Sequence, residues 1–433
     1  MATQTNEQRL AALREEYATL KALGLALDLT RGKPSSAQLD LSNAMLGSID
    51  PSTASGNNSE STDLRNYGGL SGLAAAKTWF ADMLDIDLEG SDSAIFVGGN
   101  SSLSLMQFSL WLANFFGMKA GDASWQEEAN GAGVKMLCPV PGYDRHFSLC
   151  EHLGIEMIPV ALTGHGPDMD QVEALVKSDP LIKGIWCVPR FSNPTGETYS
   201  PETVERIAKL ASSAGKNFYV FWDNAYAVHA LSDDATALEP IMSIAEANGT
   251  LDSILHFAST SKVSFAGAGM SALATSKANM AGFLKQFGFT SIGPDKLNQL
   301  RHLQMLPDRA ALAEHMRKHA ASITDKFQCV EKILTELLSG DSEAEYGEWT
   351  SPEGGYFISF DTQPGLASRV ISLAAEAGVK LTPAGSTFPY RKDPNDSNIR
   401  LAPTFPALAE VEQAIRVFAV CVKLATVEKL TES

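Results

Sequence analysis

From about residue 70 onward, short apolar runs alternate with segments of helical periodicity. The apolar runs are predicted strands at 94–98, 135–140, 155–161, 184–189, 218–223, 254–258 and 269–275. Several of them lack polar alternation, which is typical of strands covered on both faces. Helical patterns fall between them, at 102–116, 169–177 and 201–214. This order predicts an α/β fold in which helices cover both sides of a mostly parallel, seven-stranded sheet.

The length of 433 residues exceeds what one compact core normally holds, so we expect two domains. Residues 63–303 form the predicted large domain, and residues 304–433 form a smaller α/β domain to which the segment 1–62 contributes. The small domain is expected to open with a long helix over 307–340. Its other predicted elements are a helix near 7–22, strands near 356–360, 379–381 and 399–401, and a closing helix from Pro406 to about Val427. The Gly- and Ala-rich stretch 118–133 is predicted to be a surface insertion.

Composition excludes several classes of function. The formal charge of −17 argues against a nucleic-acid partner or an anionic membrane surface. The polar first residues lack the apolar stretch of a signal peptide, and no window approaches an apolar span of membrane length. Five dispersed cysteines without metal-ligand spacing fit a reducing compartment. We therefore expect a cytoplasmic protein with no metal site.

A lysine, a carboxylate, an amide and a phenol follow predicted strands. Lys262 comes after strand 254–258, Asp223 ends strand 218–223 with Tyr226 three residues on, and Asn193 follows strand 184–189 in Asn-Pro-Thr-Gly. Ligands of open α/β sheets bind beyond the carboxyl ends of the strands. An amine forms a Schiff base with an aldehyde, a carboxylate holds a pyridinium proton, and an amide and a phenol bind a ring oxygen. The set predicts a site for pyridoxal 5'-phosphate (PLP).

Lys262, Asp223 and Tyr226 are the predicted catalytic residues. Small hydroxyl neighbours and a Gly-rich sequence surround Lys262, so we expect desolvation to lower its pKa and favour the neutral amine. Each residue alone has an ordinary structural explanation, such as a helix cap for Asp223. Their occurrence together and in this order favours the cofactor site.

Further residues complete the predicted site. Gly99, Asn100 and Ser101 lie in a Gly-rich turn that opens a helix, as a phosphate-binding loop does. The remaining candidates are the hydroxyls of Ser259 and Ser261 for the phosphate, Tyr143 for stacking on the ring, and Arg400 as a bidentate fork for a substrate carboxylate.

With these motifs in order, the chain resembles the fold-type I PLP enzymes, specifically the class I and II aminotransferases, from Tyr67 to Arg400 and beyond. It is similar to a bacterial aspartate aminotransferase-like branch that carries Thr30-Arg31-Gly32-Lys33-Pro34. The resemblance implies a homodimer with shared active sites, in which Tyr67 binds the phosphate of the neighbouring subunit. It also implies that Gly32 lies beside the substrate, and that Asn193 and Arg400 belong to the cofactor and α-carboxylate residues.

One position departs from the family pattern. The family usually places an arginine eight residues after the lysine, where it neutralises the phosphate, and Met270 stands there in this chain. The departure affects the expected cofactor affinity more than the expected chemistry.

The predicted activity is transamination of a dicarboxylic amino acid, with L-aspartate and 2-oxoglutarate ranked first. The distal carboxylate requires a second cation, for which Arg31 and Lys33 rank ahead of Arg391 because they flank Gly32. A PLP-dependent lyase or synthase on the same fold stays open, since 141–145 resembles ring-forming synthases. A non-catalytic PLP-binding relative is the third alternative. No Gly-x-Gly-x-x-Gly motif supports an oxidoreductase.

Overall fold

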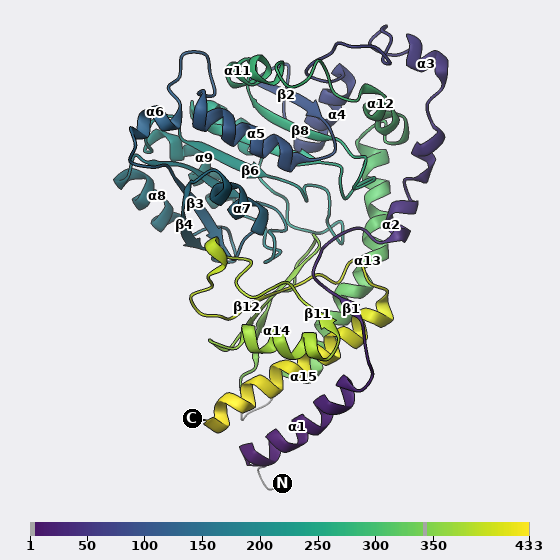
Figure 1. Cartoon of the computed structure of the whole chain (residues 1–433). Helices are drawn as coiled ribbons and strands as arrows, with labels where there is room; N and C mark the ends of the chain where they lie inside the picture. The colour runs from purple at the N-terminus through teal and green to yellow at the C-terminus, as the bar shows by residue number, and fades with distance from the viewer. Residues whose placement is uncertain (1–4, 341–343, 433) are drawn as a thin grey trace.

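A twisted seven-stranded sheet forms the centre of the larger domain in this computed structural model, which describes residues 5–340 and 344–432 (Figure 1). In spatial order its strands are β2 (Ser93–Gly98), β8 (Ser271–Ser276), β7 (Ile254–Ser259), β6 (Tyr219–Asp223), β5 (Ile182–Cys187), β3 (Lys135–Val140) and β4 (Glu156–Ala161). All neighbours pair in parallel except β8, which runs antiparallel to both β2 and β7. Every predicted strand is confirmed, as is the mostly parallel sheet.

Alternate residues of the central strands enter two different hydrophobic layers. In β6, Val220 and Trp222 face one apolar cluster, whereas Tyr219 and Phe221 face the other. Because both faces are covered, a strand of this kind reads as a continuous apolar run. The first layer contains α4 (Ala74–Leu84), α8 (Met169–Ser178), α9 (Pro201–Lys209) and α10 (Ile241–Ala247). The second contains α5 (Ser102–Phe115), α6 (Trp125–Ala129), α7 (Asp144–His152) and α11 (Lys277–Phe287).

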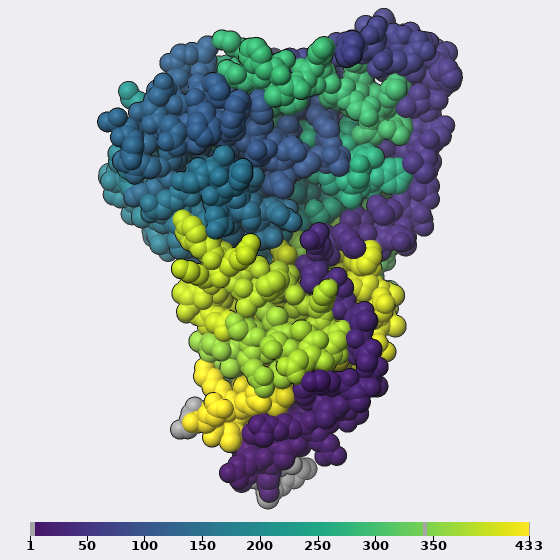
Figure 2. Space-filling view, in the orientation of Figure 1, coloured from purple at the N-terminus to yellow at the C-terminus, as the bar shows by residue number. Residues whose placement is uncertain are grey.

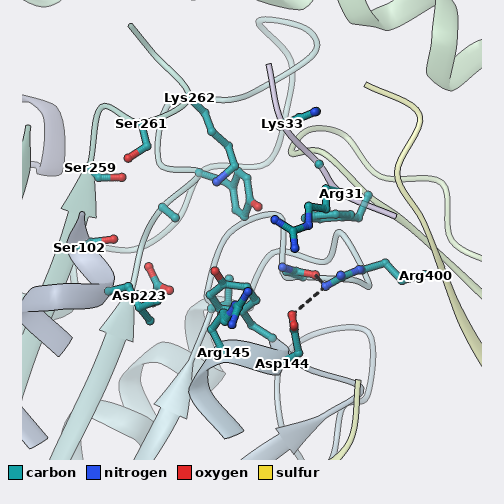
Figure 3. A pocket seen from close by; sticks show the side chains of 18 of the residues that line it. Arg31, Lys33, Ser102, Asp144, Arg145, Asp223, Ser259, Ser261, Lys262 and Arg400 are labelled. Carbon is teal, nitrogen blue, oxygen red and sulfur yellow. Dashed lines mark hydrogen bonds and ion pairs between the residues drawn. The ribbon is translucent and has the colours of Figure 1, made fainter. Parts of the chain in front are cut away.

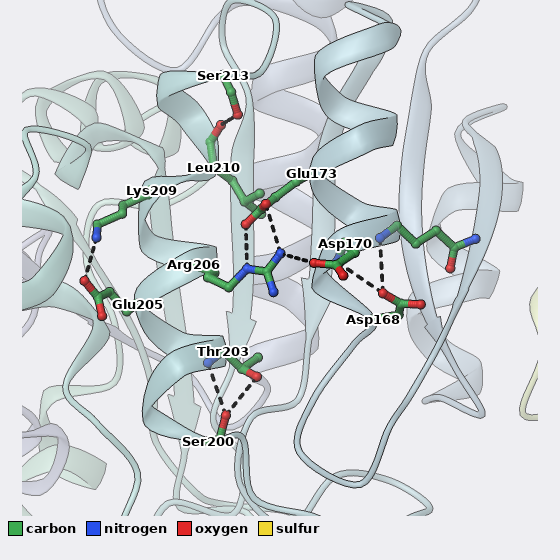
Figure 4. Close-up of polar contacts among 11 residues, drawn as sticks. Asp168, Asp170, Glu173, Ser200, Thr203, Glu205, Arg206, Lys209, Leu210 and Ser213 are labelled. Carbon is green, nitrogen blue, oxygen red and sulfur yellow. Dashed lines mark hydrogen bonds and ion pairs between the residues drawn. The ribbon is translucent and has the colours of Figure 1, made fainter.

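Arg206 joins two helices of the first layer. It extends from α9 and contacts Glu173 of α8 through Nε at 2.7 Å and Asp170 of the same helix at 2.6 Å (Figure 4). Ser200 caps the first turn of α9 by accepting a hydrogen bond from the Thr203 amide. These polar contacts sit outside the apolar layer and orient the two helices over the sheet.

The stretch 118–133 is not a simple surface insertion, so that prediction is wrong in part. It contains α6, and its Trp125 is fully buried among the second-layer residues with its indole N–H donating to the Asn217 carbonyl at 2.7 Å. Met118 and Ala129 are also buried. The prediction fails because glycines and polar residues dominate the composition of this stretch, although three of its apolar side chains pack in the second layer.

The smaller domain combines two short sheets with long helices. Its antiparallel sheet has the order β12 (Asn398–Leu401), β10 (Ile358–Thr362), β9 (Gly347–Trp349), and β1 (Leu27–Asp28) pairs in parallel with β11 (Val379–Lys380). The helices around them are α1 (Asn6–Lys21), α14 (Ala367–Glu376) and α15 (Leu408–Glu432). Leu10, Tyr17 and Leu29 of the N-terminal segment are part of this core.

Helix α13 (Arg309–Leu338) runs through both domains. Leu312 and Met316 near its start pack into the large-domain core, and from Ile323 onward its apolar residues pack into the small-domain core. The N-terminal segment then continues along one edge of the molecule through α2 (Ser36–Asp40), η1 (Asn43–Gly47) and α3 (Pro51–Ser55) to the large domain (Figure 2). The domain boundaries at 62/63 and 303/304 stay predictions.

The remaining short elements are α12 (Lys296–Met305), η2 (Leu210–Ser212), η3 (Leu251–Ser253) and η4 (Pro389–Arg391). Among the described residues, no helix is both long enough and apolar enough to span a bilayer.

Candidate active site

A cavity of about 610 Å³ lies beyond the carboxyl ends of β5, β6 and β7, and residues of both domains line it. Of the predicted site residues, it is lined by Arg31, Gly32, Lys33, Ser101, Tyr143, Asn193, Asp223, Tyr226, Ser259, Ser261, Lys262 and Arg400. Gly99, Asn100 and Tyr67 do not line it. Residues that are up to 370 positions apart in the chain therefore meet where the sheet topology predicts a ligand.

Lys262 extends into this cavity from the loop that follows β7. Its Nζ lies 4.8 Å from the centre of the Tyr226 ring and 5.8 Å from that of Tyr356. Burial lowers the pKa of Lys262, and the negative charge of Asp223 acts in the opposite direction. The lowered pKa increases the fraction of neutral amine, which is the nucleophilic form.

Asp223 is held on one side and unsatisfied on the other. Its Oδ2 lies 2.9 Å from Nε2 of His146, and the His146 ring stacks on Trp186 with centroids 4.0 Å apart and an interplanar angle of 5°. Its Oδ1 is buried and has no hydrogen-bond partner among the described residues. Because an unpaired buried carboxylate oxygen is costly, the position fits a charged N–H donor such as a pyridinium.

Sequence reasoning missed His146. The signal is its position in the first turn of α7, three residues after the N-cap residue Tyr143. Their rings meet edge to face, with centroids 4.9 Å apart. The polar partner of Asp223 is therefore supplied by the same turn as the predicted stacking tyrosine.

Two phenols stay protonated at neutral pH. Burial raises the pKa of Tyr226, and it raises the pKa of Tyr143 to about 12 with a smaller contribution from Asp223. Tyr226 can therefore donate a hydrogen bond to an anionic oxygen in the cavity. Asn193 lies opposite, with its Oδ1 accepting a hydrogen bond from Arg400 at 3.3 Å. Its amide nitrogen stays available as a donor.

Hydroxyl groups and a helix start form one side of the cavity. Ser102, Ser259 and Ser261 lie on this side in Figure 3, and the arginines Arg31 and Arg400 lie on the other. Ser101 is the N-cap residue of α5 but makes no side-chain capping bond, so the first-turn N–H groups of that helix lack this partner. This arrangement fits a phosphate.

The backbone carbonyls of Gly99 and Asn100 accept hydrogen bonds from two serine hydroxyls. The Ser261 hydroxyl donates to the Asn100 carbonyl at 2.8 Å, and the Ser271 hydroxyl donates to the Gly99 carbonyl at 2.7 Å. The two backbone carbonyls thereby fix the serine hydroxyls, and neither Gly99 nor Asn100 lines the cavity.

Met270 is buried in the large-domain core and does not line the cavity. Its backbone N–H donates to the Thr260 hydroxyl at 2.8 Å, and the Thr260 N–H donates to its carbonyl at the same distance. The methionine therefore packs as a core residue. The hydroxyl side of the cavity has no arginine from this position, so serine hydroxyls and helix N–H groups are the donors there that could hold a phosphate.

Arg400 occupies β12 and points into the cavity against Asp144, Asn193 and Phe357. Its Nη1 lies 3.2 Å from Asp144 Oδ1, and its guanidinium carbon lies 4.9 Å from the centre of the Phe357 ring. Its Nε is buried without a partner. A planar guanidinium with an unused donor is suited to bidentate binding of a carboxylate.

Arg31 and Lys33 of the segment 30–34 both line the cavity, but their charged ends are placed differently. Figure 3 shows Arg31 pointing inward, whereas the Lys33 Nζ lies 3.8 Å from the centre of the Phe405 ring. Arg145, which follows Asp144, also lines the cavity, and Arg391 does not. A Cβ added at Gly32 would meet the Phe357 ring at 2.5 Å, so the close approach of this segment requires glycine.

Tyr67 lies outside the cavity and is 83% exposed. Lys296 shapes its loop by donating to the carbonyls of Asn66 and Gly68, each at 2.8 Å. The phenol of Tyr67 is thus presented outward on a fixed loop.

The chain is similar to known proteins over nearly its whole length. A family model described as aspartate amino-transferase matches residues 1–433. An aspartate aminotransferase of Corynebacterium glutamicum is 45% identical over 421 residues, which are 96% of this chain and 93% of that protein.

Solved structures give the same picture. The crystal structure of an aspartate transaminase from Corynebacterium glutamicum superposes with a TM-score of 0.92 at 42% identity, covering 99% of this chain and 98% of that one. A multiple substrate aminotransferase of Thermococcus profundus shares the fold at 17% identity, with a TM-score of 0.74 over 100% of this chain and 97% of that chain.

Proposed function

Since this chain belongs to the aspartate aminotransferase family and is a transaminase, we propose that it uses PLP to move the amino group of a dicarboxylic amino acid, with L-aspartate ranked first, to 2-oxoglutarate. One observation carries the cofactor proposal: Lys262 and Asp223 line the same cavity, and Oδ1 of Asp223 is buried there without a hydrogen-bond partner among the described residues. The name of the relative from Corynebacterium glutamicum supports the substrate.

PLP supplies an aldehyde that bonds the substrate amine and a protonated ring that withdraws electrons from the substrate Cα. Asp223 would hold the ring proton with its unpaired Oδ1, while His146 fixes Oδ2. As a neutral amine, Lys262 would accept the proton from the substrate Cα and give up a proton again later in the exchange. Its lowered pKa increases the fraction of the neutral amine, which is the form that accepts a proton.

Arg400 binds the α-carboxylate in this proposal. The incoming carboxylate replaces Asp144 on Nη1 and gains the unused Nε donor. Arg31 is the first choice for the distal carboxylate, because Lys33 is engaged over Phe405. Arg145 is the second choice by its place in the lining.

The exposed loop of Tyr67 supports a homodimer in which each phenol completes the partner's phosphate site. We also propose that the enzyme works in the cytoplasm.

The test is an activity screen of donors against acceptors with added PLP. The proposal expects oxaloacetate from L-aspartate only when 2-oxoglutarate is present, with an equal amount of glutamate formed. Amine loss or ring formation without an acceptor would establish the lyase or synthase alternative instead.

A further inference from the structure

A buried polar network lies behind Lys262 and joins three parts of the chain. Nε2 of His315 lies 2.7 Å from the carbonyl of Val263, the residue after Lys262, and 3.1 Å from Nε2 of His319. Nδ1 of His319 lies 3.3 Å from the amide nitrogen of Gln38. The same nitrogen donates to the Tyr356 hydroxyl at 2.9 Å.

The network extends from the N-terminal segment to the lysine loop. Gln38 belongs to α2, a few residues after the segment 30–34 that lines the cavity. Both histidines belong to α13, on successive turns that face the lysine loop. All of these side chains except the catalytic lysine lie outside the cavity lining.

Hydrogen-bond chemistry fixes the proton positions in this network. Oε1 of Gln38 accepts from the Ser35 amide at 3.0 Å, so its nitrogen must face His319 and Tyr356. Nδ1 of His319 is therefore an acceptor, and its proton is on Nε2. A carbonyl can only accept, so His315 also carries its proton on Nε2 and donates it to Val263. With a proton on each Nε2, the 3.1 Å contact between the two rings is not a hydrogen bond, and the His319 N–H faces the same Val263 carbonyl.

The charges around the pair agree with neutral rings. Burial lowers the pKa of His319 to about 4, with a smaller contribution from His315, and burial also lowers the pKa of His315. The titratable groups that act on the two rings are His229 from the large domain and Lys318 of the same helix, and the hydrogen-bond partners of the rings are Gln38 and the Val263 carbonyl. No carboxylate is among these contacts in the described part of the chain. The Nε2–H groups of His315 and His319 therefore both face the Val263 carbonyl, next to Lys262.

We propose that Gln38, His319 and His315 are positioning residues that hold the Val263 carbonyl and thereby aim the Lys262 amine for proton transfer. The inference rests on the proposed role of Lys262 in the transaminase reaction. It links the substrate-facing N-terminal segment to the lysine through a single amide, Gln38.

The test compares paired variants of the PLP-loaded enzyme. Gln38→Leu removes the amide, and Gln8→Leu is its matched control, because Gln8 forms the same capping box in α1 far from the cavity. His319→Leu removes the imidazole, whereas His319→Gln keeps an N–H donor and an acceptor near the two ring positions. Thermal unfolding establishes that each variant is folded.

Three readouts separate positioning from a merely structural loss. We expect kcat to fall about tenfold in Gln38→Leu and His319→Leu with KM changed less than about twofold, which corresponds to loss of an interaction that acts on the transition state. The kinetic isotope effect with Cα-deuterated aspartate should increase, because proton transfer becomes slower. The pH midpoint of the visible absorbance of bound PLP should also move. His319→Gln should recover kcat to within about threefold of the wild type, and Gln8→Leu should match the wild type.

Unchanged isotope effects and absorbance midpoints in both leucine variants would overturn the inference while leaving the proposed function intact. If His319→Leu does not fold, Gln38→Leu and His319→Gln decide the matter alone. A wild-type protein that shows no visible absorbance with PLP would refute the proposed function, and this inference with it.

Discussion

The two sides of the active-site cavity are built differently. The side proposed for the cofactor consists of Asp223, Tyr226 and Asn193, all buried and set close to strand ends. The side proposed for the distal substrate carboxylate carries Arg31, Lys33 and Arg145, all exposed and close to loops. Side chains locked by packing keep a reactive geometry, whereas exposed cations adapt to different ligands. For the proposed function, the difference predicts that the sheet fixes the chemistry and that the loops set the choice of substrate.

The largest expected effect is on the buried side, at Asp223. Replacing it by Ala removes the partner of the ring nitrogen in a desolvated site, so we expect kcat to fall about 10³-fold. The kcat of Asp223→Asn should fall by a comparable factor, because asparagine keeps the shape of the side chain but not its charge. Steady-state kinetics with aspartate and 2-oxoglutarate measure both variants, and activity within tenfold of the wild type would remove Asp223 from the mechanism.

Arg400 bridges the two sides, and we expect a smaller loss there. Arg400→Leu should lower kcat/KM about 100-fold for every amino acid substrate, because all of them share the α-carboxylate. Arg400→Lys should recover only part of this, since an ammonium cannot bind a carboxylate in the same bidentate way. A loss confined to dicarboxylic substrates would instead place the distal carboxylate at Arg400.

On the exposed side, Arg31→Met should raise KM for aspartate about tenfold, the value of one charge-assisted hydrogen bond. KM for alanine should stay nearly unchanged, because alanine has no distal carboxylate. Lys33→Met is the matched control and should have less effect, since Lys33 lies over Phe405. Equal changes in KM for aspartate and alanine would show that Arg31 does not bind the distal carboxylate.

The smallest effect concerns stability. Burial lowers the pKa of Lys262 in the folded protein, so this lysine binds its proton more tightly in the unfolded chain. At neutral pH this difference lowers the free energy of unfolding. Lys262→Met should therefore stabilise the cofactor-free protein by about 1 kcal/mol. The gain in stability should be largest at a pH below the pKa of Lys262 in the folded protein. It should vanish as the pH rises past about 10, the pKa of lysine in the unfolded chain. Denaturant unfolding of both proteins at pH 7 and pH 10 measures it, and a gain independent of pH would contradict this origin.

Sequence patterns located the buried side well because its residues are local to strand ends. The apolar run 218–223 determines both the strand and the place of Asp223, and the same holds for 254–258 and Lys262. A continuous apolar run can be recognised without knowledge of its neighbours. The parallel order of these strands then brings their carboxyl ends together.

Other contacts could not be read from the sequence, because they depend on packing between distant segments. Gln38 meets His319 across 281 positions, and the local capping-box pattern of Gln38 gives no sign of this distant contact. The direction of Lys33 toward Phe405 depends on how the N-terminal segment lies against the small domain. In 118–133, composition concealed the buried Trp125, since a few large side chains fill a layer regardless of the glycines around them.

Reductive trapping tests the central claim most directly. The protein is mixed with PLP, treated with borohydride and digested, and the peptides are analysed by mass spectrometry. We predict that one pyridoxyl group is found on the peptide that contains Lys262, and that Asp223→Ala weakens PLP binding without moving the label. A label distributed over surface lysines, with Lys262 unmodified, would contradict the account.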